Sequence, residues 1–280
     1  MSRVYEALRQ MEKDQGQSGD SPFLQPTGLL ADATANEGEL KSVRPIEVNV
    51  LPASRLVTLS EPRSFGAQQF LTLVTRLENL RRQKEMKSFQ VTSSVASEGK
   101  TLVAANLAVT FAKSSRSKVL LLEGDLHRPS LAGLLGLKEL KGLSHWWLEQ
   151  CPDISRFLYQ LNGMPLWLLG AGAMYEQPSH VWQSARFAEA FGRLTEWFDW
   201  IVVDSTPMLA AVDANLWSRL VDGTLLVIRE GVAPVKALKK GLRALDNPKL
   251  IGIVMNAASE LDPRYYRDQY YGTPKKISKS

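Results

Sequence analysis

Cysteine and histidine are scarce in this sequence. The single cysteine, Cys151, excludes a disulfide within the chain and fits a reducing compartment. The three histidines, His127, His145 and His180, are scattered and lack the spacing of zinc ligands. No Gly-x-Ser-x-Gly motif occurs. These shortages argue against a disulfide scaffold, a zinc hydrolase and a common serine hydrolase.

Long apolar runs and strong charge of one sign are also missing. The longest nearly unbroken apolar stretch covers residues 102–112, which is too short to span a bilayer. Residues 1–13 are too charged for a signal peptide, so we expect a cytoplasmic protein. Lysine and arginine number 34 against 29 acidic residues, a net charge of +5. This mild excess suits an anionic ligand such as a nucleotide, and we expect no nucleic-acid partner.

The chain divides by composition into four parts. Residues 1–13 predict a short amphipathic helix, since Val4, Leu8 and Met11 share one face. A helix this short is marginal alone, so it should dock on a partner or on the body of the protein. Residues 14–60 predict a flexible linker without fixed structure, residues 61–262 a nucleotide-binding domain, and residues 263–280 a tyrosine-rich tail.

Between residues 65 and 255, predicted helices and strands alternate. Several strands are apolar throughout, which is typical of a parallel sheet covered on both faces. The sequence therefore predicts an α/β fold, with a mostly parallel sheet between two layers of helices. We expect helices at 65–85, 101–113, 185–197, 213–220 and 234–244, and strands at 88–92, 118–122, 166–169, 200–203, 224–228 and 250–255.

A phosphate-binding loop is predicted between the strand at 88–92 and the helix at 101–113. Gly99, Lys100 and Thr101 match the end of the G-x-x-x-x-G-K-[ST] pattern, and Ser94 occupies the place of its first glycine. Backbone N–H groups would hold phosphate oxygens, while the lysine neutralises them and the threonine hydroxyl binds Mg²⁺. The alternative is a polar turn with a solvated lysine.

Acidic residues follow two of the apolar strands. Glu123 and Asp125 end the strand at 118–122, and Asp204 ends the strand at 200–203. In a parallel sheet these ends lie near the phosphate loop. Carboxylates there can hold Mg²⁺ or accept a proton from a nucleophile. His127, in the same segment, is predicted to be a surface residue.

The tail holds four of the seven tyrosines, namely Tyr265, Tyr266, Tyr270 and Tyr271. Their spacing fits neither a core strand nor a core helix. One interpretation is aromatic packing of a terminal segment. The other is a mobile phosphate acceptor, in which each phosphate adds nearly two negative charges.

Taken in order, these segments resemble the bacterial tyrosine autokinases of capsule and exopolysaccharide export. The resemblance covers residues 62–272 and rests on 97–101, 123–129, 204–207, 220–232, Asn256 and the tyrosine cluster. The opening residues 1–9 resemble stand-alone members, whose transmembrane activator is a separate chain. The resemblance implies a phosphate-loop fold of the MinD- and ParA-like type.

The resemblance also implies an activity, which is the transfer of the ATP γ-phosphate to tyrosines of the tail, mostly between subunits. It implies partners as well: a membrane chain-length protein as activator, a possible homo-oligomer and a tyrosine phosphatase. The protein would control polymer length or export from the inner face of the membrane. Lys100, Glu123, Asp125 and Asp204 are then the catalytic candidates. Candidate nucleotide contacts are Ser97, Glu98, Gly99, Lys100, Thr101, Leu102 and Asn256, and the candidate Mg²⁺ ligands are Thr101, Asp125 and Asp204.

The sequence departs from the family pattern at three places. Ala96 and Ser97 replace Pro-Gly before Glu-Gly-Lys, and serine takes a positive φ less readily than glycine. Glu123 replaces an aspartate, which moves the carboxylate by about one bond length. The charged residues of the family's assembly helix are replaced by Gln68, Leu71 and Val74.

Two other functions are compatible with these departures. One is a nucleotide-binding regulatory subunit with little or no kinase activity, although retention of all four tail tyrosines counts against it. The other is a positioning ATPase of the MinD or ParA kind, but these usually carry a second lysine early in the phosphate loop, and residues 93–97 have none.

Overall fold

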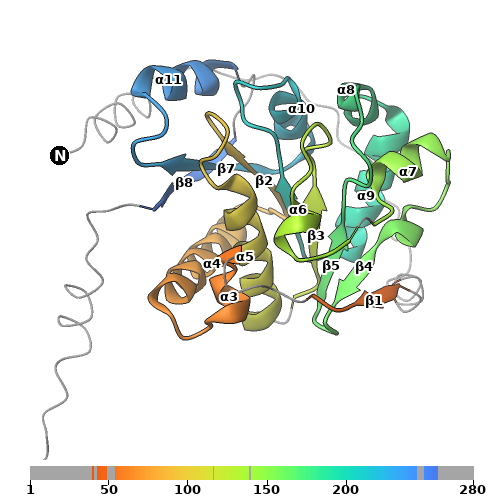
Figure 1. Cartoon of the computed structure of the whole chain (residues 1–280), viewed down its shortest axis with the longest axis horizontal. Coiled ribbons are helices and arrows are strands. Elements are labelled where there is room, and N and C mark those ends of the chain that lie inside the picture. The colour runs from red at the N-terminus through yellow and green to blue at the C-terminus, as the bar shows by residue number, and fades with distance from the viewer. Residues whose placement is uncertain are drawn as a thin grey trace, which may run out of the picture.

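The computed structural model describes Leu40 and residues 43–48, 54–115, 117–138, 140–244 and 249–257. Its centre is an eight-stranded sheet in the order β1-β4-β5-β3-β6-β2-β7-β8 (Figure 1). All neighbouring strands are parallel except β4 and β5. The strands are β1 (Arg44–Ile46), β2 (Ser88–Ser93), β3 (Val119–Glu123), β4 (Tyr159–Leu161), β5 (Leu166–Leu169), β6 (Trp200–Asp204), β7 (Gly223–Arg229) and β8 (Leu250–Asn256).

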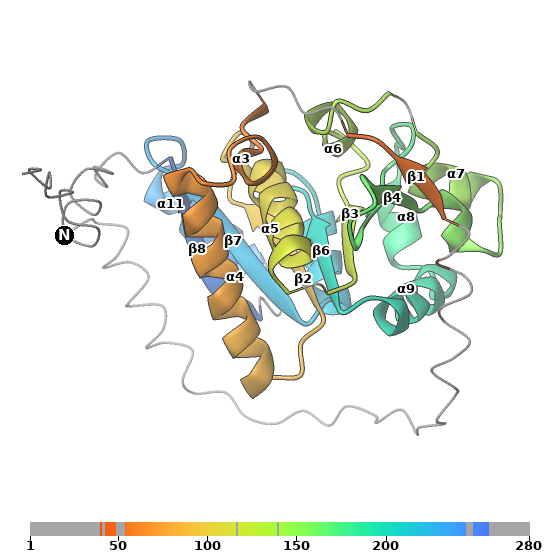
Figure 2. The ribbon, with the colours of Figure 1, turned by 90° about the horizontal axis from the view of Figure 1, so that it is seen from below.

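Helices cover both faces of the sheet (Figure 2), as predicted. Helices α3 to α6 pack with one hydrophobic core, and those from α7 onward lie on the opposite face. The helices are α3 (Val57–Ser60), α4 (Phe65–Gln83), α5 (Lys100–Ser114), α6 (Leu131–Leu134), α7 (Leu143–Leu148), η2 (Ile154–Phe157), α8 (Pro178–Trp182), α9 (Ala185–Trp197), α10 (Asp213–Leu220) and α11 (Val235–Ala244).

Local sequence signals account for the main elements. Every residue of β3 and β6 is buried, as expected for strands covered on both faces. Ser64 caps α4 by accepting a hydrogen bond from the N–H of Ala67, and Ser184 caps α9 through Phe187. The predicted helices at 185–197 and 213–220 match α9 and α10, and the other predicted elements match to within two residues.

Aromatic side chains fill the layers on both sides of the sheet. On the face of α4 and α5, the ring of Trp200 lies 4.5 Å from that of Phe111 and 5.9 Å from that of Phe89. On the opposite face, Trp217 packs against Trp182 at 4.6 Å. Each buried ring removes a large apolar area from water and packs directly against neighbouring rings, which stabilises the contact between the helices and the sheet.

The prediction of a linker from residue 14 to residue 60 is wrong over its last part. Residues 44–46 form β1, which pairs in parallel with β4, and α3 follows at Val57–Ser60. Leu40 and Val43 are buried in the core near α7, and Leu56 is fully buried. These apolar residues are widely separated along the sequence, so no periodic pattern indicates their burial.

A β-hairpin was also absent from the predicted elements. Strands β4 and β5 are joined through Asn162 and Gly163, which both have positive φ. Asn-Gly is a strong hairpin signal because both residues tolerate this conformation. The hairpin reverses the strand direction at this end of the sheet, so β4 and β1 run opposite to the others.

Two of the three replaced assembly positions lie on the surface of α4. Gln68 and Leu71 are exposed, whereas Val74 is buried in the core. In the part of the chain that the structure describes, no helix has the length and hydropathy needed to cross a bilayer. The predicted helix at 2–13 and the tyrosine cluster at 265–271 lie outside the described residues.

Candidate active site at the phosphate loop

The loop between β2 and α5 has the shape that a phosphate cradle needs. Gly99 adopts φ +95° immediately before the helix begins, and a Cβ atom there would lie 2.1 Å from the amide of Asn256. Ser97 also has a positive φ, +69°. This conformation is costly for a serine, so the family's usual glycine would be less strained there. The replacement of the family's glycine by Ser97 therefore falls at a position where the backbone is strained.

Glu98 anchors this loop to the neighbouring strands. Its buried carboxylate accepts hydrogen bonds from the N–H of Val95 at 2.9 Å and from the N–H of Arg229 at 3.3 Å. Its backbone carbonyl accepts a bond from the side-chain amide of Asn256 at 2.8 Å. The side chain of Glu98 thus ties the loop to β7, since both carboxylate oxygens accept backbone N–H groups, while the predicted contact of Glu98 with the nucleotide stays a prediction.

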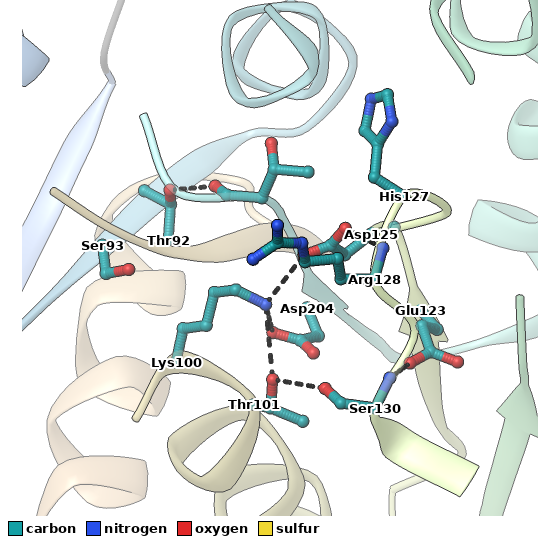
Figure 3. A network of polar contacts seen from close by, with 12 residues as sticks. Thr92, Ser93, Lys100, Thr101, Glu123, Asp125, His127, Arg128, Ser130 and Asp204 are labelled. Carbon is teal, nitrogen blue, oxygen red and sulfur yellow. Dashed lines mark hydrogen bonds and ion pairs between the residues drawn. The ribbon is translucent and has the colours of Figure 1, made fainter. Parts of the chain in front are cut away.

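Lys100 is the centre of the polar network in Figure 3. Its ammonium nitrogen lies 3.2 Å from Asp125 Oδ2, 3.4 Å from Asp204 Oδ1 and 3.3 Å from Thr101 Oγ1. Burial alone would lower the pKa of the lysine, but the two carboxylates outweigh it and leave that pKa raised. The structure thus brings together four of the residues that the sequence singled out.

Asp204 is fully buried at the end of β6. Burial raises the pKa of its carboxyl group to about 6, although the positive charge of Lys100 opposes that shift. Its Oδ2 atom has no hydrogen-bond partner in the described part of the chain. A buried carboxylate oxygen without a partner is costly, so its position favours a cationic or water-bearing ligand nearby.

The network opens onto a cavity of about 850 Å³. Its wall includes Lys100, Thr101 and Asp125, and it also includes Ser97, Gly99 and Leu102 from the predicted nucleotide contacts. Sequence reasoning assigned no site role to the further lining residues, which follow β3 and β6, although four of them fall within the segments 123–129 and 204–207. These further residues are His127, Arg128, Ser130, Leu134, Thr206, Pro207, Ala210 and Ala211.

Glu123 is not among the residues that line this cavity, and its predicted catalytic role stays a prediction. Its buried carboxylate accepts hydrogen bonds from the backbone N–H groups of Ser130, Leu131 and Ala171. Burial raises the pKa of this carboxyl group, and those three hydrogen bonds oppose the shift. The extra methylene lets Glu123 reach backbone groups behind the loop, so it positions the loop while Asp125 faces the cavity.

Hydrogen bonds also fix the loop that follows β3. The N–H of Arg128 donates to Asp125 Oδ1 at 3.0 Å, and the hydroxyl of Ser130 lies 3.1 Å from that of Thr101 (Figure 3). His127 is partly exposed, as predicted, but its Nε2 atom lies 2.9 Å from Asp213 Oδ2. Burial raises the pKa of Asp213, and His127 opposes this shift. The loop is thus tied to the first turn of α5 and to the first turn of α10.

Asn256 ends β8 beside the phosphate loop. Its side-chain amide donates to Glu98, and it is not part of the cavity wall described above. The predicted contact with adenine therefore stays a prediction. The hydrogen bond from Asn256 to Glu98 joins strand β8 to the phosphate loop, across a sequence separation of 158 residues.

Comparison with known proteins identifies the relatives of the chain. No protein-family model matches it. It is 30% identical over 220 residues to the tyrosine-protein kinase YwqD of Bacillus subtilis, covering 78% of this chain and 91% of the relative. It is 29% identical over 191 residues to the tyrosine-protein kinase CpsD of Streptococcus pneumoniae, covering 67% and 83%. The succinoglycan biosynthesis transport protein ExoP of Rhizobium meliloti is 24% identical over 226 residues, 79% of this chain and 29% of ExoP.

Solved structures share the fold. The kinase domain of the Escherichia coli tyrosine kinase ETK superposes with a TM-score of 0.66 and 22% identity, covering 82% of this chain and 98% of that domain. The cell-division ATPase MinD of Pyrococcus furiosus gives 0.51 and 23%, covering 63% and 74%. The predicted MinD-like α/β fold is therefore confirmed. With its similarity to YwqD along most of both chains, this protein belongs to the bacterial tyrosine-protein kinases.

Proposed function

We propose that the protein is an ATP- and Mg²⁺-dependent autokinase that phosphorylates Tyr265, Tyr266, Tyr270 and Tyr271. One observation carries the proposal. Lys100, on the cavity wall, forms ion pairs with Asp125 and Asp204, which lie at the carboxyl ends of two neighbouring strands. In phosphate-loop enzymes, such a lysine stabilises the charge of the transferring phosphoryl group, while acids and a hydroxyl organise Mg²⁺.

The residues present suit a magnesium ion. Thr101, Asp125 and Asp204 offer one hydroxyl and two carboxylates, and Mg²⁺ usually combines so few protein ligands with water and phosphate oxygens. The unpartnered Asp204 Oδ2 atom suits the water shell of such an ion. Among the described residues, no cluster of three or more His, Cys, Asp or Glu offers an all-protein cage. Bound Mg²⁺ would offset the negative charge of the phosphates.

In the proposed reaction, a tyrosine oxygen forms a bond to the γ-phosphorus of ATP. The bond from that phosphorus to the bridging oxygen breaks, which gives ADP and phosphotyrosine. The phenolic proton passes to Asp125, which lies on the cavity wall. Lys100 stabilises the charge on the transferring group, and backbone N–H groups of the loop hold the phosphates.

The cellular context is proposed from the relatives. ExoP is named for the biosynthesis and transport of a polysaccharide. By this analogy the protein would serve exopolysaccharide or capsule production, at the membrane through a chain-length protein that activates it. A tyrosine phosphatase would reverse the modification.

Phosphate mapping tests the proposal. The full chain and its Lys100→Ala variant are incubated with ATP and Mg²⁺, and residues 261–272 are examined by peptide mass spectrometry. We expect phosphotyrosine in the wild type and none in the variant, since Lys100 joins the loop to both acids. The control is Lys84→Ala, which removes an exposed lysine at the end of α4.

Equal phosphorylation of both chains would contradict the assigned role of Lys100. If the wild type stays unmodified even with its membrane activator, the protein is a nucleotide-dependent scaffold rather than a kinase. The strained backbone at Ser97 would then be the first candidate cause of the lost kinase activity. Nucleotide binding, measured in parallel, separates that outcome from a failure to bind ATP.

A further inference from the structure

Helix α11 presents a strongly basic face that the proposed reaction does not use. Its ten residues include Lys236, Lys239, Lys240 and Arg243, and no acidic residue occurs between 231 and 244. Positions 236, 240 and 243 are spaced by four and three residues, so they share one side of the helix. All three side chains are exposed, and none of the four cations forms an ion pair with a described residue.

The opposite side of α11 is used for packing. Leu238 is buried with Leu226 and Ile228 of β7, and Leu242 packs against the same cluster. Gly241 allows close approach, because a Cβ atom there would lie 2.8 Å from Met208. The helix therefore keeps no leucine on its solvent face. An interfacial membrane helix buries a broad apolar face in lipid, so this arrangement favours a soluble anionic ligand over a bilayer.

The topology places the start of this helix where the tail leaves the domain. Strands β7 and β8 are parallel and α11 connects them, so the helix runs back across the sheet and begins at its carboxyl edge (Figure 1). Strand β8 ends at Asn256 on that edge. Tyr265 follows nine residues later, and an extended chain of that length spans up to about 30 Å. The helix itself is about 15 Å long, so the tyrosines can reach its whole face.

Phosphorylation would change the charge of the tail strongly. Residues 261–272 contain two arginines, Arg264 and Arg267, and two aspartates, Asp262 and Asp268, so their net charge is zero. Four phosphotyrosines would add about −6 to −8. Before modification the segment has no net attraction to a basic helix. Afterwards it would be strongly attracted, since phosphates form charge-assisted hydrogen bonds with lysine and arginine.

From these observations we infer that the exposed cations of α11 bind the phosphorylated tyrosine cluster of the tail, in the same chain or in a second copy. This inference rests on the proposed autophosphorylation, which supplies the ligand. Binding would dock the product tail on the face of the sheet opposite α4, clear of the cavity. The helix would thus distinguish a modified tail from an unmodified one.

The test uses a synthetic peptide, so it does not depend on the protein's own activity. Labelled peptides of residues 261–272, with four phosphotyrosines or with none, are titrated against the full chain carrying Lys100→Ala, whose own tail remains unmodified. Fluorescence anisotropy should show binding of the phosphopeptide alone. Neutralising α11 with Lys236→Gln, Lys240→Gln and Arg243→Gln together should weaken that binding by about tenfold or more.

The matched control removes the same charge from the other face of the sheet. Arg76→Gln, Arg82→Gln and Lys84→Gln change three exposed cations in or just after α4 and should leave the affinity unchanged. Conservative changes, Lys236→Arg with Lys240→Arg, should retain it. Circular dichroism and nucleotide binding confirm that each variant is folded.

Two results would overturn the inference. The first is phosphopeptide binding that is absent or equally strong in the α11 variant. The second is that α11 cations are required only for binding vesicles of phosphatidylglycerol and phosphatidylcholine, which would make the face a membrane contact. Because the peptide is made chemically, a failed kinase assay together with α11-dependent binding would count against the proposed function alone.

Discussion

The side-chain amide of Asn256 donates a hydrogen bond to the backbone carbonyl of Glu98 at 2.8 Å, and this bond joins the last strand to the phosphate loop. The same loop is held from β7, where the N–H of Arg229 donates to the carboxylate of Glu98. The edge strand β8 and its neighbour β7 therefore set the shape of the cradle. Substitutions in β8 should therefore alter nucleotide affinity, because they change the position of the phosphate loop.

Asn256→Ala should weaken nucleotide binding without changing base preference. Loss of the bond to Glu98 should cost about 1 kcal/mol of unfolding free energy. ATP and GTP affinities should fall by similar factors, since the loop holds phosphates rather than the base. Calorimetric titration with both nucleotides checks this. A selective loss of ATP affinity would instead support the direct adenine contact predicted from the sequence.

Ser97→Gly should stabilise the protein. Glycine tolerates the φ of +69° that the loop requires there, whereas a serine pays about 1 kcal/mol for it. The added flexibility of glycine in the unfolded state offsets part of the gain, so we expect a net increase of about 0.5 kcal/mol. Urea unfolding measures this difference.

The control for that change is Ala96→Gly in the same loop. Ala96 is exposed and does not have a positive φ, so glycine there brings mainly its entropic cost and should destabilise. If both changes lower the free energy of unfolding equally, the conformation of Ser97 is not strained in solution.

Asp204→Asn should stabilise the folded protein most at neutral pH while abolishing phosphorylation. Burial raises the pKa of Asp204 to about 6 from an ordinary value of 3.8, so the folded state favours the protonated acid. The stability that protonation provides is full below pH 3.8 and is lost as the pH rises through about 6. Asparagine removes this loss, which amounts to up to about 3 kcal/mol.

Urea unfolding of the Asp204→Asn variant at neutral pH and near pH 4 checks this dependence. The exposed acid Glu61, changed to Gln, is the control and should give the same small difference at both values. A stabilisation by Asp204→Asn that is independent of pH would show that the carboxyl group is not protonated in the fold within this range.

The two acids after β3 should respond differently to substitution. Asp125→Asn should abolish phosphate transfer, because the carboxylate lies on the cavity wall, and its stability cost should come from the lost ion pair with Lys100, which keeps Asp204 as a partner. Glu123→Asp, which restores the family's usual residue, should instead destabilise by about 1–3 kcal/mol, since the shorter side chain cannot reach all three N–H groups. Thermal unfolding and single-turnover kinetics separate the two effects. If Glu123→Asp slowed phosphate transfer as much as Asp125→Asn without lowering stability, Glu123 would have a direct role in the reaction.

Features that repeat locally were predictable from the sequence. The uniformly apolar runs of β3 and β6, the capped α9 and the Gly-Lys-Thr triplet each indicate their structure within a few residues. The alternation of these helices and strands along the chain then indicates an α/β fold with a mostly parallel sheet. The Asn162–Gly163 turn carried a usable signal as well, and it would have identified β4.

Long-range partners were not predictable in this way. Glu98 and Glu123 look like site residues because they lie in the motifs, yet each turns its carboxylate toward backbone N–H groups of distant segments. Nothing near Glu123 in the sequence indicates that Ala171 lies beside it. Likewise, β1 has only three residues, and its place is set by the free edge of β4.

The hairpin of β4 and β5 has a consequence for the whole molecule. It adds β4, and with it β1, to the side of the sheet away from β8, so the described chain enters at one lateral edge and leaves at the other. Seven strand spacings of about 4.8 Å separate these edges by roughly 34 Å. A regulator that binds at β1 would therefore contact the edge of the sheet opposite to Asn256, where β8 ends, and would leave the β8 edge free for a second partner.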